Sequence, residues 1–350
     1  MKPATNNLPN PTINDIARVA RVSLATVDRV LNARPGVREA TVQKVNKAIA
    51  ELGYVRDTAA ANLARGRIYN FLFILPSNSN EFLVMLEAQI EQLNRRMRHE
   101  RTKLSYTRVT AFDPMALAEA IDAVDASKID GVAIFGPETP SVRDSIAHLK
   151  ANGVTVVSLV ADVPSSERDF YVGLDNVAAG RTAAQLLGRF LGETRGKIAV
   201  LTGSMLARDH LERRLGFDEV MARDFPNLDV LASLEGRDDP DLIEKLVPEA
   251  LGDAEDVIGI YSSAAGNEGL LRAFRTWRPA RRPVVIAHEL TPLSRSALMA
   301  GAFDAVISQD CGHLVRSAVR IMRAYSDNTP INLAQERIRI DIYLKENMPQ

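Results

Sequence analysis

The start of the chain carries apolar residues at helical spacing, which predicts three short helices. The first follows the tetrapeptide Thr12-Ile-Asn-Asp15, whose hydroxyl and carboxylate have the spacing of a capping box. A second helix is expected after Ser23, a favourable N-cap residue, and a third over residues 38–52, ahead of Gly53. Each helix has one apolar face, so the three can share a small core.

From Tyr69 onward, apolar runs of four to eight residues alternate with helical segments, a pattern typical of parallel sheets covered by helices. The roughly 280 residues in this pattern exceed one doubly wound sheet, so we expect two lobes with a crevice at the carboxyl ends of the strands. The predicted strands are Asn70–Leu75, Leu104–Val109, Gly131–Phe135, Val154–Leu159, Lys197–Leu201, Val230–Ser233, Val257–Tyr261, Val284–Ala287, Ala305–Ile307 and Glu336–Ile342.

The composition is that of an ordinary globular protein, with 46% apolar and 25% charged residues among 350. The longest apolar runs, such as residues 154–161, are far shorter than the roughly 20 residues of a membrane-spanning helix. The first ten residues lack the apolar segment of a secretory signal, and Cys311 is the single cysteine. We therefore expect a cytoplasmic protein without an intramolecular disulfide, in which Cys311 is a buried apolar group.

The net charge of −1 conceals an uneven distribution of charge. Residues 1–67 hold eleven Lys and Arg against five Asp and Glu, whereas the rest of the chain holds 32 against 39. Because an acidic surface is repelled by phosphate, only the basic first segment is suited to contact a polyanion such as DNA.

The first two predicted helices, joined by a tight turn, form a helix-turn-helix pattern. The segments 22–32, 37–41 and 50–54 closely resemble the headpiece of the LacI/GalR family of transcriptional regulators, and the resemblance extends from Thr12 to Gly66. It implies sequence-specific binding to double-stranded operator DNA. The matching positions that would read base edges are Leu24, Ala25 and Arg29, and those that would hold phosphates are Thr12, Ser23, Thr26 and Asn32.

The segment Asp57–Gly66 is expected to be a hinge helix too short to be stable alone in water. Two copies could pack together and wedge their Leu63 side chains between base steps of the minor groove. The family resemblance implies this role for Leu63 and places the small residue Ala60 in the groove.

Three residues depart from the family pattern. Arg21 replaces a turn glycine, so we expect a non-glycine residue at positive φ. Asp28 stands where serine is common, and its charge would oppose phosphate unless Arg29 or a base amine engages it. Leu24 and Ala25 offer no hydrogen bonds, so much of the readout is expected from Arg29, thymine methyl contacts and groove deformation.

The rest of the chain resembles the type I periplasmic-binding-protein fold that this family carries behind its headpiece. The expected fold class is therefore a small all-α headpiece plus an α/β body of two doubly wound parallel sheets. The expected domains are a helix-turn-helix headpiece over 11–55, a hinge helix and linker over 56–67, and a ligand-binding and dimerisation body over 68–342. The resemblance implies three chain crossings, with lobe 1 at about 68–172 and 292–306 and lobe 2 at about 173–291 and 307–342.

Polar residues at the expected strand ends are the candidate ligand groups, because a cleft needs only a few placed polar contacts to orient a small molecule. Arg213 lies where the resemblance places an arginine that grips hydroxyls or a carboxylate. His288 and Glu289 replace an aspartate pair, and the mixture suits a sugar or polyol. The full candidate set is Asn80, Phe82, Asp175, Arg213, Ser263, Asn267, His288, Glu289 and Gln309.

Two other classes of function, an enzyme and a sugar-binding protein, are compared with a DNA-binding regulator. The chain has no phosphate-binding glycine loop, no nucleophile elbow and no metal-ligand spacing among its five histidines, so neither catalytic residues, nor a cofactor, nor a metal are expected. The adjacent Asp209 and His210 are interpreted as a surface pair rather than an acid–base pair. A cytoplasmic sugar-binding protein without a regulatory role is the closer alternative, and a sugar-modifying enzyme the more distant one.

The sequence thus predicts a cytoplasmic DNA-binding regulator, not an enzyme, that acts as a homodimer and responds to a sugar or polyol. The family resemblance makes repression the expected output. Only residues 343–350 follow the last predicted strand, too few for a leucine-heptad tail that would join dimers into a tetramer.

Overall fold

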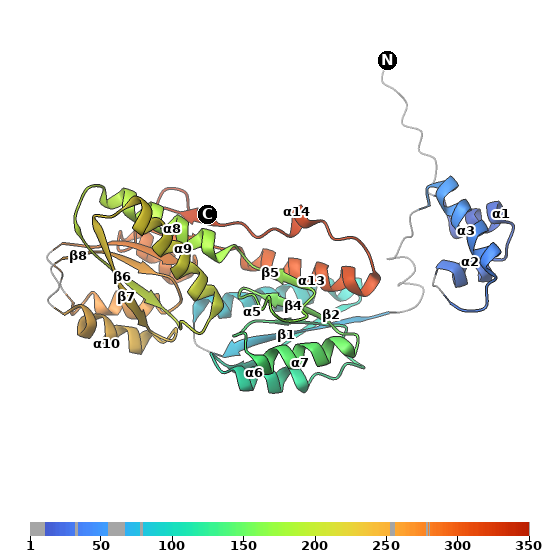
Figure 1. Cartoon of the computed structure of the whole chain (residues 1–350), viewed down its shortest axis with the longest axis horizontal. Helices are drawn as coiled ribbons and strands as arrows, with labels where there is room; N and C mark the ends of the chain where they lie inside the picture. Colours follow the sequence, from blue (N-terminus) through green and yellow to red (C-terminus); the bar gives the residue numbers. More distant parts are fainter. Residues whose placement is uncertain are drawn as a thin grey trace, which may run out of the picture. The chain divides into compact units, whose positions relative to one another are not determined.

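The computed structural model describes residues 11–31, 34–54, 67–77, 80–252, 256–277, 279 and 281–349. The chain divides into two compact units, one up to Arg67 and one from Ile68 onward (Figure 1). The described residues 11–54 of the first unit are called the headpiece, and the second unit is called the body. Within the described ranges, no helix is long and apolar enough to cross a membrane.

The headpiece consists of three helices, α1 (Ile13–Ala20), α2 (Leu24–Leu31) and α3 (Glu39–Leu52). The predicted capping box is confirmed, because Thr12 and Asp15 exchange side-chain and backbone hydrogen bonds at the start of α1. Gly53 ends α3 in the left-handed conformation, as expected for a C-terminal glycine. The three helices share a core that is formed by Ile16, Ala20, Val27, Val45 and Ala48.

The first sheet of the body has five parallel strands in the order β2-β1-β3-β4-β5. The strands are β1 (Tyr69–Ser77), β2 (Thr102–Thr110), β3 (Gly131–Ile134), β4 (Thr155–Leu159) and β5 (Phe170–Val172). Alternate residues of β1 enter two cores, one shared with α5 (Glu81–Met97) and α13 (Cys311–Asp327) and one with α6 (Pro114–Asp122) and α7 (Pro140–Ala151). A short 3-10 helix, Arg98–Glu100, follows α5.

The second sheet has six strands in the order β11-β10-β9-β8-β6-β7, parallel except for β11. The strands are β6 (Gly196–Thr202), β7 (Leu228–Glu235), β8 (Val257–Ser262), β9 (Val284–His288), β10 (Ala305–Ser308) and β11 (Asp341–Tyr343). Helices α8 (Asn176–Leu191) and α9 (Arg208–Asp224) lie over one face (Figure 1). The other face is covered by α10 (Pro240–Leu251), α11 (Asn267–Ala273) and α12 (Pro292–Met299).

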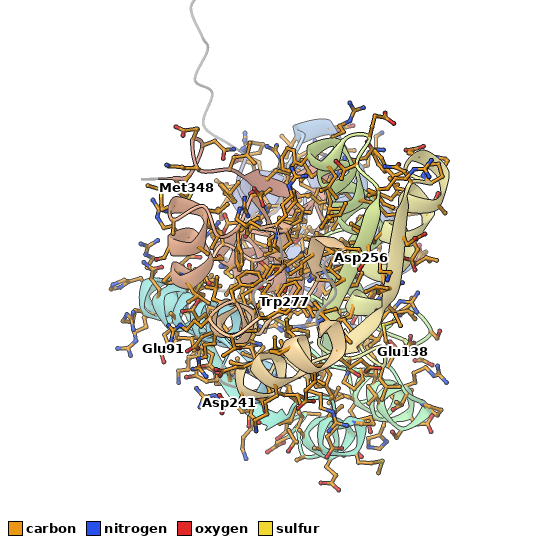
Figure 2. The ribbon with its side chains drawn as sticks, turned by 90° about the vertical axis from the view of Figure 1, so that its left-hand side faces the viewer. Glu91, Glu138, Asp241, Asp256, Trp277 and Met348 are labelled. Atoms are coloured by element: carbon orange, nitrogen blue, oxygen red, sulfur yellow. The ribbon has the colours of Figure 1, made fainter. Side chains whose placement is uncertain are left out.

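Figure 2 views the body from the end formed by the second sheet. Trp277 is buried in the core beneath α10 and α11, and its Nε1 donates a hydrogen bond to the Gly252 carbonyl at 3.1 Å. The exposed Asp241 of α10 and the exposed Asp256 at the start of β8 lie on this lobe. The hydrophobic cores of the body place helices on both faces of each sheet, and the predicted fold class is confirmed.

The predicted division of the body into lobes needs a correction at its C-terminal end. Residues 292–306 were assigned to lobe 1, but α12 packs on α11 and β10, and β10 pairs with β9 in the second sheet. Residues 307–342 were assigned to lobe 2, but α13 packs against α5, β3 and β4 of the first lobe. The chain therefore crosses after β5, between β10 and α13, and again before β11. The apolar pattern of an element shows that it is buried, but not which sheet it covers.

Two strand predictions also differ from the structure. The three-residue strand β5 was missed because it is too short to show a pattern. The last strand was predicted over Glu336–Ile342, but the strand β11 of the structure covers only Asp341–Tyr343. The residues Leu333–Glu336 form a helical turn, α14. The Glu336 carboxylate is buried against Ser317 and Arg320 of α13, which holds this returning segment against the first lobe.

Candidate functional site

The headpiece presents the predicted base-reading residues on the surface of α2. Leu24, Ala25 and Arg29 are exposed, and Leu24 is 49% exposed although it is a large apolar residue. An exposed leucine at the N-terminal end of the second helix of a helix-turn-helix is suited to contact a thymine methyl group. At the same end, the hydroxyl groups of Ser23 and Thr26 lie 2.9 Å apart and Ser23 accepts from the Thr26 amide, so Ser23 caps the helix.

The turn between α1 and α2 has the predicted strain. Arg21 lies at φ 54° and ψ 48°, in the left-handed region that glycine normally occupies. The charge of Asp28 is engaged by Arg34, whose Nη1 lies 3.3 Å from the carboxylate, a partner that was not predicted from the sequence. Arg29 is exposed on the surface of α2.

Of the remaining predicted DNA contacts, only Thr12 lies among the described residues. Thr12 is exposed, and its hydroxyl donates to the Asp15 carboxylate at 2.8 Å while it caps α1. Asn32, Ala60 and Leu63 lie outside the described residues, as does the whole of the predicted hinge helix.

Two adjoining cavities lie between the lobes of the body, at the carboxyl ends of the strands. The first, of about 40 Å³, is lined by Phe112, Phe135, Asp209 and His210, among others. The second, of about 50 Å³, is lined by Phe82, Asn267, His288 and Glu289, among others. Asn80 and Asp238 line both cavities, so together they form one inter-lobe cleft.

Arg213 is the buried cation of the cleft, with 3% of its surface exposed. Its Nε donates to Oδ1 of Asn176 at 2.8 Å, and its Nη1 donates to the Ser263 carbonyl at 2.7 Å. Its Nη2 lies 3.9 Å from the Glu289 carboxylate. A guanidinium held on two sides by fixed acceptors is pre-organised, although Arg213 is not itself among the residues that line the two cavities.

Two glycines place Arg213 beside Asn176 by allowing α8 and α9 to approach closely. A Cβ atom on Gly180 would lie 1.9 Å from the backbone oxygen of Arg213, and one on Gly216 would lie 2.0 Å from that of Val177. Both contacts are with backbone atoms, which cannot give way as a side chain could. The two helices can cross at this distance only because neither glycine has a side chain.

Glu289 and Gln309 complete the polar cluster around Arg213. Gln309 follows β10 and donates from Nε2 to Glu289 at 2.9 Å, while its own Oε1 is buried without a hydrogen-bond partner among the described residues. Burial raises the pKa of the Glu289 carboxyl above 4.5, and this effect outweighs the opposing influences of Arg213 and Gln309. A buried amide oxygen without a partner is a natural acceptor for a ligand hydroxyl.

His288 is held in its neutral form. Its Nε2 lies 2.9 Å from the Tyr261 hydroxyl, and its carbonyl accepts from Asn267 Nδ2 at 3.1 Å. Burial lowers the pKa of His288 well below 6.5, and the nearby Arg213 lowers it further. At neutral pH this imidazole therefore contributes hydrogen-bonding groups and no charge.

Two predicted ligand residues have other roles in the structure. Asp175 is exposed, and its carboxylate accepts from the Ala178 amide at 2.9 Å as the N-cap of α8. Its neighbour Asn176, which belongs to the same lobe-crossing motif of the family, is the residue that contacts Arg213. The Ser263 hydroxyl donates to the Leu201 carbonyl inside the second lobe, so Ser263 positions Arg213 through its own carbonyl. These two assignments are corrected accordingly.

The interpretation of Asp209 and His210 as a surface pair was wrong. Asp209 is 3% exposed, His210 is 6% exposed, and both line the first cavity. Asp209 and His210 lie in the first turn of α9, which follows a cleft strand, and adjacency in sequence gave no sign that both side chains are buried there. Asp238, also buried and also missed, lies on the loop that follows β7.

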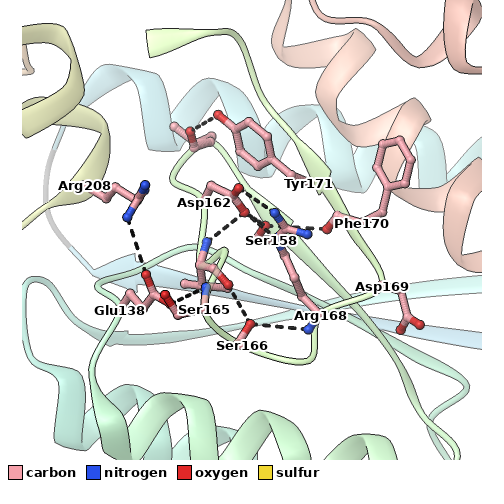
Figure 3. Close-up of polar contacts among 12 residues, drawn as sticks. Glu138, Ser158, Asp162, Ser165, Ser166, Arg168, Asp169, Phe170, Tyr171 and Arg208 are labelled. Carbon is pink, nitrogen blue, oxygen red and sulfur yellow. Dashed lines mark hydrogen bonds and ion pairs between the residues drawn. The ribbon is translucent and has the colours of Figure 1, made fainter. Parts of the chain in front are cut away.

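Contacts across the cleft join the two lobes. Glu138, after β3, lies 3.7 Å from Nη1 of Arg208 in α9 and accepts a 2.8 Å hydrogen bond from the Ser165 amide (Figure 3). The loop that carries Ser165 is itself fixed by Arg168, which binds the Asp162 carboxylate through two nitrogens. The rings of Phe112 and His210 face each other from opposite lobes, with centroids 6.1 Å apart.

Several residues at the strand ends have strained backbones. Four non-glycine residues at or beside the cleft have φ between 51° and 66°, namely Phe112, Arg237, Asp238 and Glu289. Such conformations cost free energy and cluster where a structure holds functional groups in a set orientation. Phe112, Asp238 and Glu289 line the cavities, which supports a binding site at this place.

The architecture defines a class of protein in which a basic helix-turn-helix unit precedes a two-lobed body with an inter-lobe cleft. Residues 12–57 match the family described as bacterial regulatory proteins, lacI family, and residues 71–330 match the periplasmic binding protein domain. The body therefore belongs to the periplasmic binding protein domain family, and the headpiece carries the DNA-binding domain of the lacI family. The predicted family is thereby confirmed.

Curated relatives include a transcriptional regulator and a catabolite control protein. The chain is 28% identical over 212 residues to the HTH-type transcriptional regulator DegA of Bacillus subtilis, with 60% of each chain covered. It is 28% identical over 199 residues to catabolite control protein A of Priestia megaterium, with 56% of each covered. The chain thus matches these relatives over less than two thirds of their length.

Solved structures with a similar body include sugar-binding proteins. A glucose-galactose binding protein, GanP, from Geobacillus stearothermophilus has a TM-score of 0.70 at 20% identity, covering 81% of this chain and all of that one. A solute binding protein from Bacillus halodurans with bound myo-inositol has a TM-score of 0.70 at 14% identity, covering 80% and 96%. At these identities the similarity establishes the fold alone.

Proposed function

We propose that this regulator is a cytoplasmic repressor whose affinity for its operator changes when a sugar or polyol binds in the inter-lobe cleft. The observation that carries the proposal is the inter-lobe cavity lined by Phe82 and Glu289, with Arg213, Asn176 and Gln309 forming a polar cluster around Glu289. Directional donors and acceptors beside an apolar ring suit a compound with several hydroxyl groups. The sugars and the polyol bound by proteins of similar fold support this class of ligand.

We further propose that the protein binds a pseudo-palindromic operator as a homodimer. One headpiece presents a single short recognition helix, so two copies are needed to read two half-sites. Ligand binding would alter the spacing of the two body entrances at Ile68 and so change whether both headpieces fit one site. The binding of the sugar or polyol and the binding of the operator DNA would then be coupled, because each favours one of two states of the dimer.

The test combines two measurements on the full chain. Thermal unfolding is recorded with glucose, galactose, arabinose, allose and myo-inositol, and a compound that raises the Tm is then added to a DNA-binding titration. We expect at least one compound to raise the Tm and to change operator affinity by about 5- to 150-fold. A compound that binds without changing operator affinity would contradict the coupling, and the absence of any binding compound would contradict the ligand class.

A further inference from the structure

The charges around the cleft are strongly one-sided. Five carboxylate residues line the two cavities, and no lysine or arginine lines either of them in the part of the chain that the structure describes. The carboxylates are those of Glu81, Asp209, Asp238, Glu268 and Glu289. Glu268 is paired with Arg272, and Glu289 lies 3.9 Å from Arg213, whereas Glu81 and Asp209 have no lysine or arginine partner among the described residues. A ligand that enters the cleft therefore meets an excess of hydrogen-bond acceptors.

Asp209 is the carboxylate most clearly available to a ligand. It is 3% exposed, it lines the first cavity, and its Oδ1 has no hydrogen-bond partner among the described residues. His210 Nε2 lies 3.6 Å from its other oxygen, too far for a hydrogen bond of ordinary length. A buried acceptor that lacks a partner is costly, and a donor supplied by a ligand removes that cost.

The arginines near the cleft are already matched by carboxylates. Arg213 lies 3.9 Å from Glu289, and its Nε and Nη1 are bound to Asn176 and Ser263. Arg208 is paired with Glu212 at 2.7 Å and with Glu138 at 3.7 Å. An anionic ligand would thus find no uncommitted cation at the cavity walls and would be repelled by the carboxylates at close range.

We propose that the cleft selects an uncharged, hydroxyl-rich ligand that donates to Asp209 and Asp238, and that it rejects phosphorylated or carboxylate derivatives of the same compound. This inference rests on the proposed function and specifies its ligand. The raised pKa values of Asp238 and Glu289, caused first by burial, fit a cleft in which further negative charge is unfavourable. The ligand is then the compound before a kinase phosphorylates it or a dehydrogenase oxidises it to an acid.

The test uses matched pairs of probes on the full-length protein, with affinities measured by calorimetry and thermal shift. The pairs are galactose and galacturonate, glucose and glucose 6-phosphate, ribose and ribose 5-phosphate, and myo-inositol and its monophosphate. We expect the neutral member of at least one pair to bind and its anionic partner to bind at least about 30-fold more weakly. An anionic member that binds as tightly as its neutral partner would overturn the inference.

The variant Asp209→Asn removes the charge and keeps the shape. Loss of a charged acceptor should weaken binding of the neutral ligand by roughly 10- to 100-fold. It should also reduce the ratio between the affinities for the neutral ligand and for its anionic partner. The control Asp175→Asn changes an exposed aspartate to another good N-cap residue and should leave both affinities unchanged. If Asp209→Asn does not fold, as judged by its unfolding curve, Asp238→Asn takes its place with the same expectations.

The outcomes separate this inference from the proposed function. Unchanged affinity and unchanged discrimination in the aspartate variant would overturn the role of the carboxylates, even if a neutral sugar still alters operator binding. Failure of every probe to bind would contradict the sugar or polyol class and the selectivity together, while operator binding measured on the same sample would still report on the headpiece.

Discussion

Arg213 donates from its Nε to Oδ1 of Asn176 at 2.8 Å, and Asn176 is the first residue of α8 after the chain crosses from the first lobe to the second. The Asn176 amide nitrogen in turn lies 3.4 Å from the Tyr171 hydroxyl and 3.5 Å from the Val160 carbonyl of the first lobe. A ligand that engages Arg213 therefore acts on a group that is linked directly to the crossing. This connection offers a physical route from the cleft to the relative orientation of the lobes.

Replacement of Arg213 by alanine should abolish the response to the ligand and leave operator binding intact. The substitution leaves Asn176 Oδ1 and the Ser263 carbonyl without their buried donor, so the body should lose about 2–4 kcal/mol of unfolding free energy. Operator affinity with and without ligand, together with denaturant unfolding, checks both effects. A variant that still responds normally would remove Arg213 from the site.

The close crossing of α8 and α9 makes Gly216 sensitive to substitution. In Gly216→Ala the new Cβ would meet the Val177 carbonyl oxygen, so the helices must separate at a cost of about 1–3 kcal/mol. Separation would also weaken the contact between Arg213 and Asn176 and lower ligand affinity.

The exposed Leu215 on the same helix provides the control for the glycine variant. Leu215→Ala should change the unfolding free energy by less than about 0.5 kcal/mol and leave ligand affinity unchanged. Equal effects of the two substitutions in denaturant unfolding would show that the close helix crossing is not what positions Arg213.

The raised pKa of Glu289 predicts a pH-dependent gain in stability for Glu289→Gln. A carboxyl whose pKa is raised on folding binds more protons in the folded state, so its contribution to stability falls as the pH rises from about 4.5 through the raised value. Glutamine does not titrate, so the Glu289→Gln variant does not lose stability in this way as the pH rises. It should therefore have the higher Tm at pH 8.

Near pH 4 the two proteins should have similar Tm values, because Glu289 is protonated in both states. The lowered pKa of His288 acts in the opposite sense, destabilising the fold as the pH falls below 6.5, but it does so in both proteins and cancels in the comparison. Thermal unfolding of both proteins from pH 4 to pH 8 is the measurement. A difference in Tm that does not depend on pH would contradict this origin.

The predicted hinge leucine can be tested although it lies outside the described residues. Leu63→Ala should weaken operator binding by about tenfold or more, because it removes the side chain expected to enter the base stack. The unfolding transition of the body should not change. Unaltered operator affinity in a fluorescence anisotropy titration would rule out the wedge.

Local features of the fold were predictable from the sequence. The capping box at Thr12 and the left-handed Arg21 depend only on residues within one turn, and both are present. In these cases the neighbours in sequence are also the neighbours in space. Arg213 and Gln309 were identified differently, through the family resemblance: Arg213 stands three residues before a glycine where the family carries an arginine, and Gln309 matches the family's last cleft strand.

The features that could not be predicted depend on contacts between distant segments. Asn176 meets Arg213 only because two glycines let their helices approach, and Asp209 enters the cleft because of the direction in which α9 starts. Helix α13 was assigned to the wrong lobe because its apolar face would suit either sheet. Sequence patterns report burial and helix ends, but the partner in a buried contact is determined by the topology of the whole body.

The central claim is tested most directly by selecting DNA from a random duplex library with the full chain, and then comparing the full chain with residues 68–350 on the selected duplex. The account predicts enrichment of a two-part, roughly symmetric sequence, binding that weakens steeply with salt, and loss of that binding when the first 67 residues are removed. Equal occupancy by residues 68–350 alone, or no enrichment of any sequence, would contradict it.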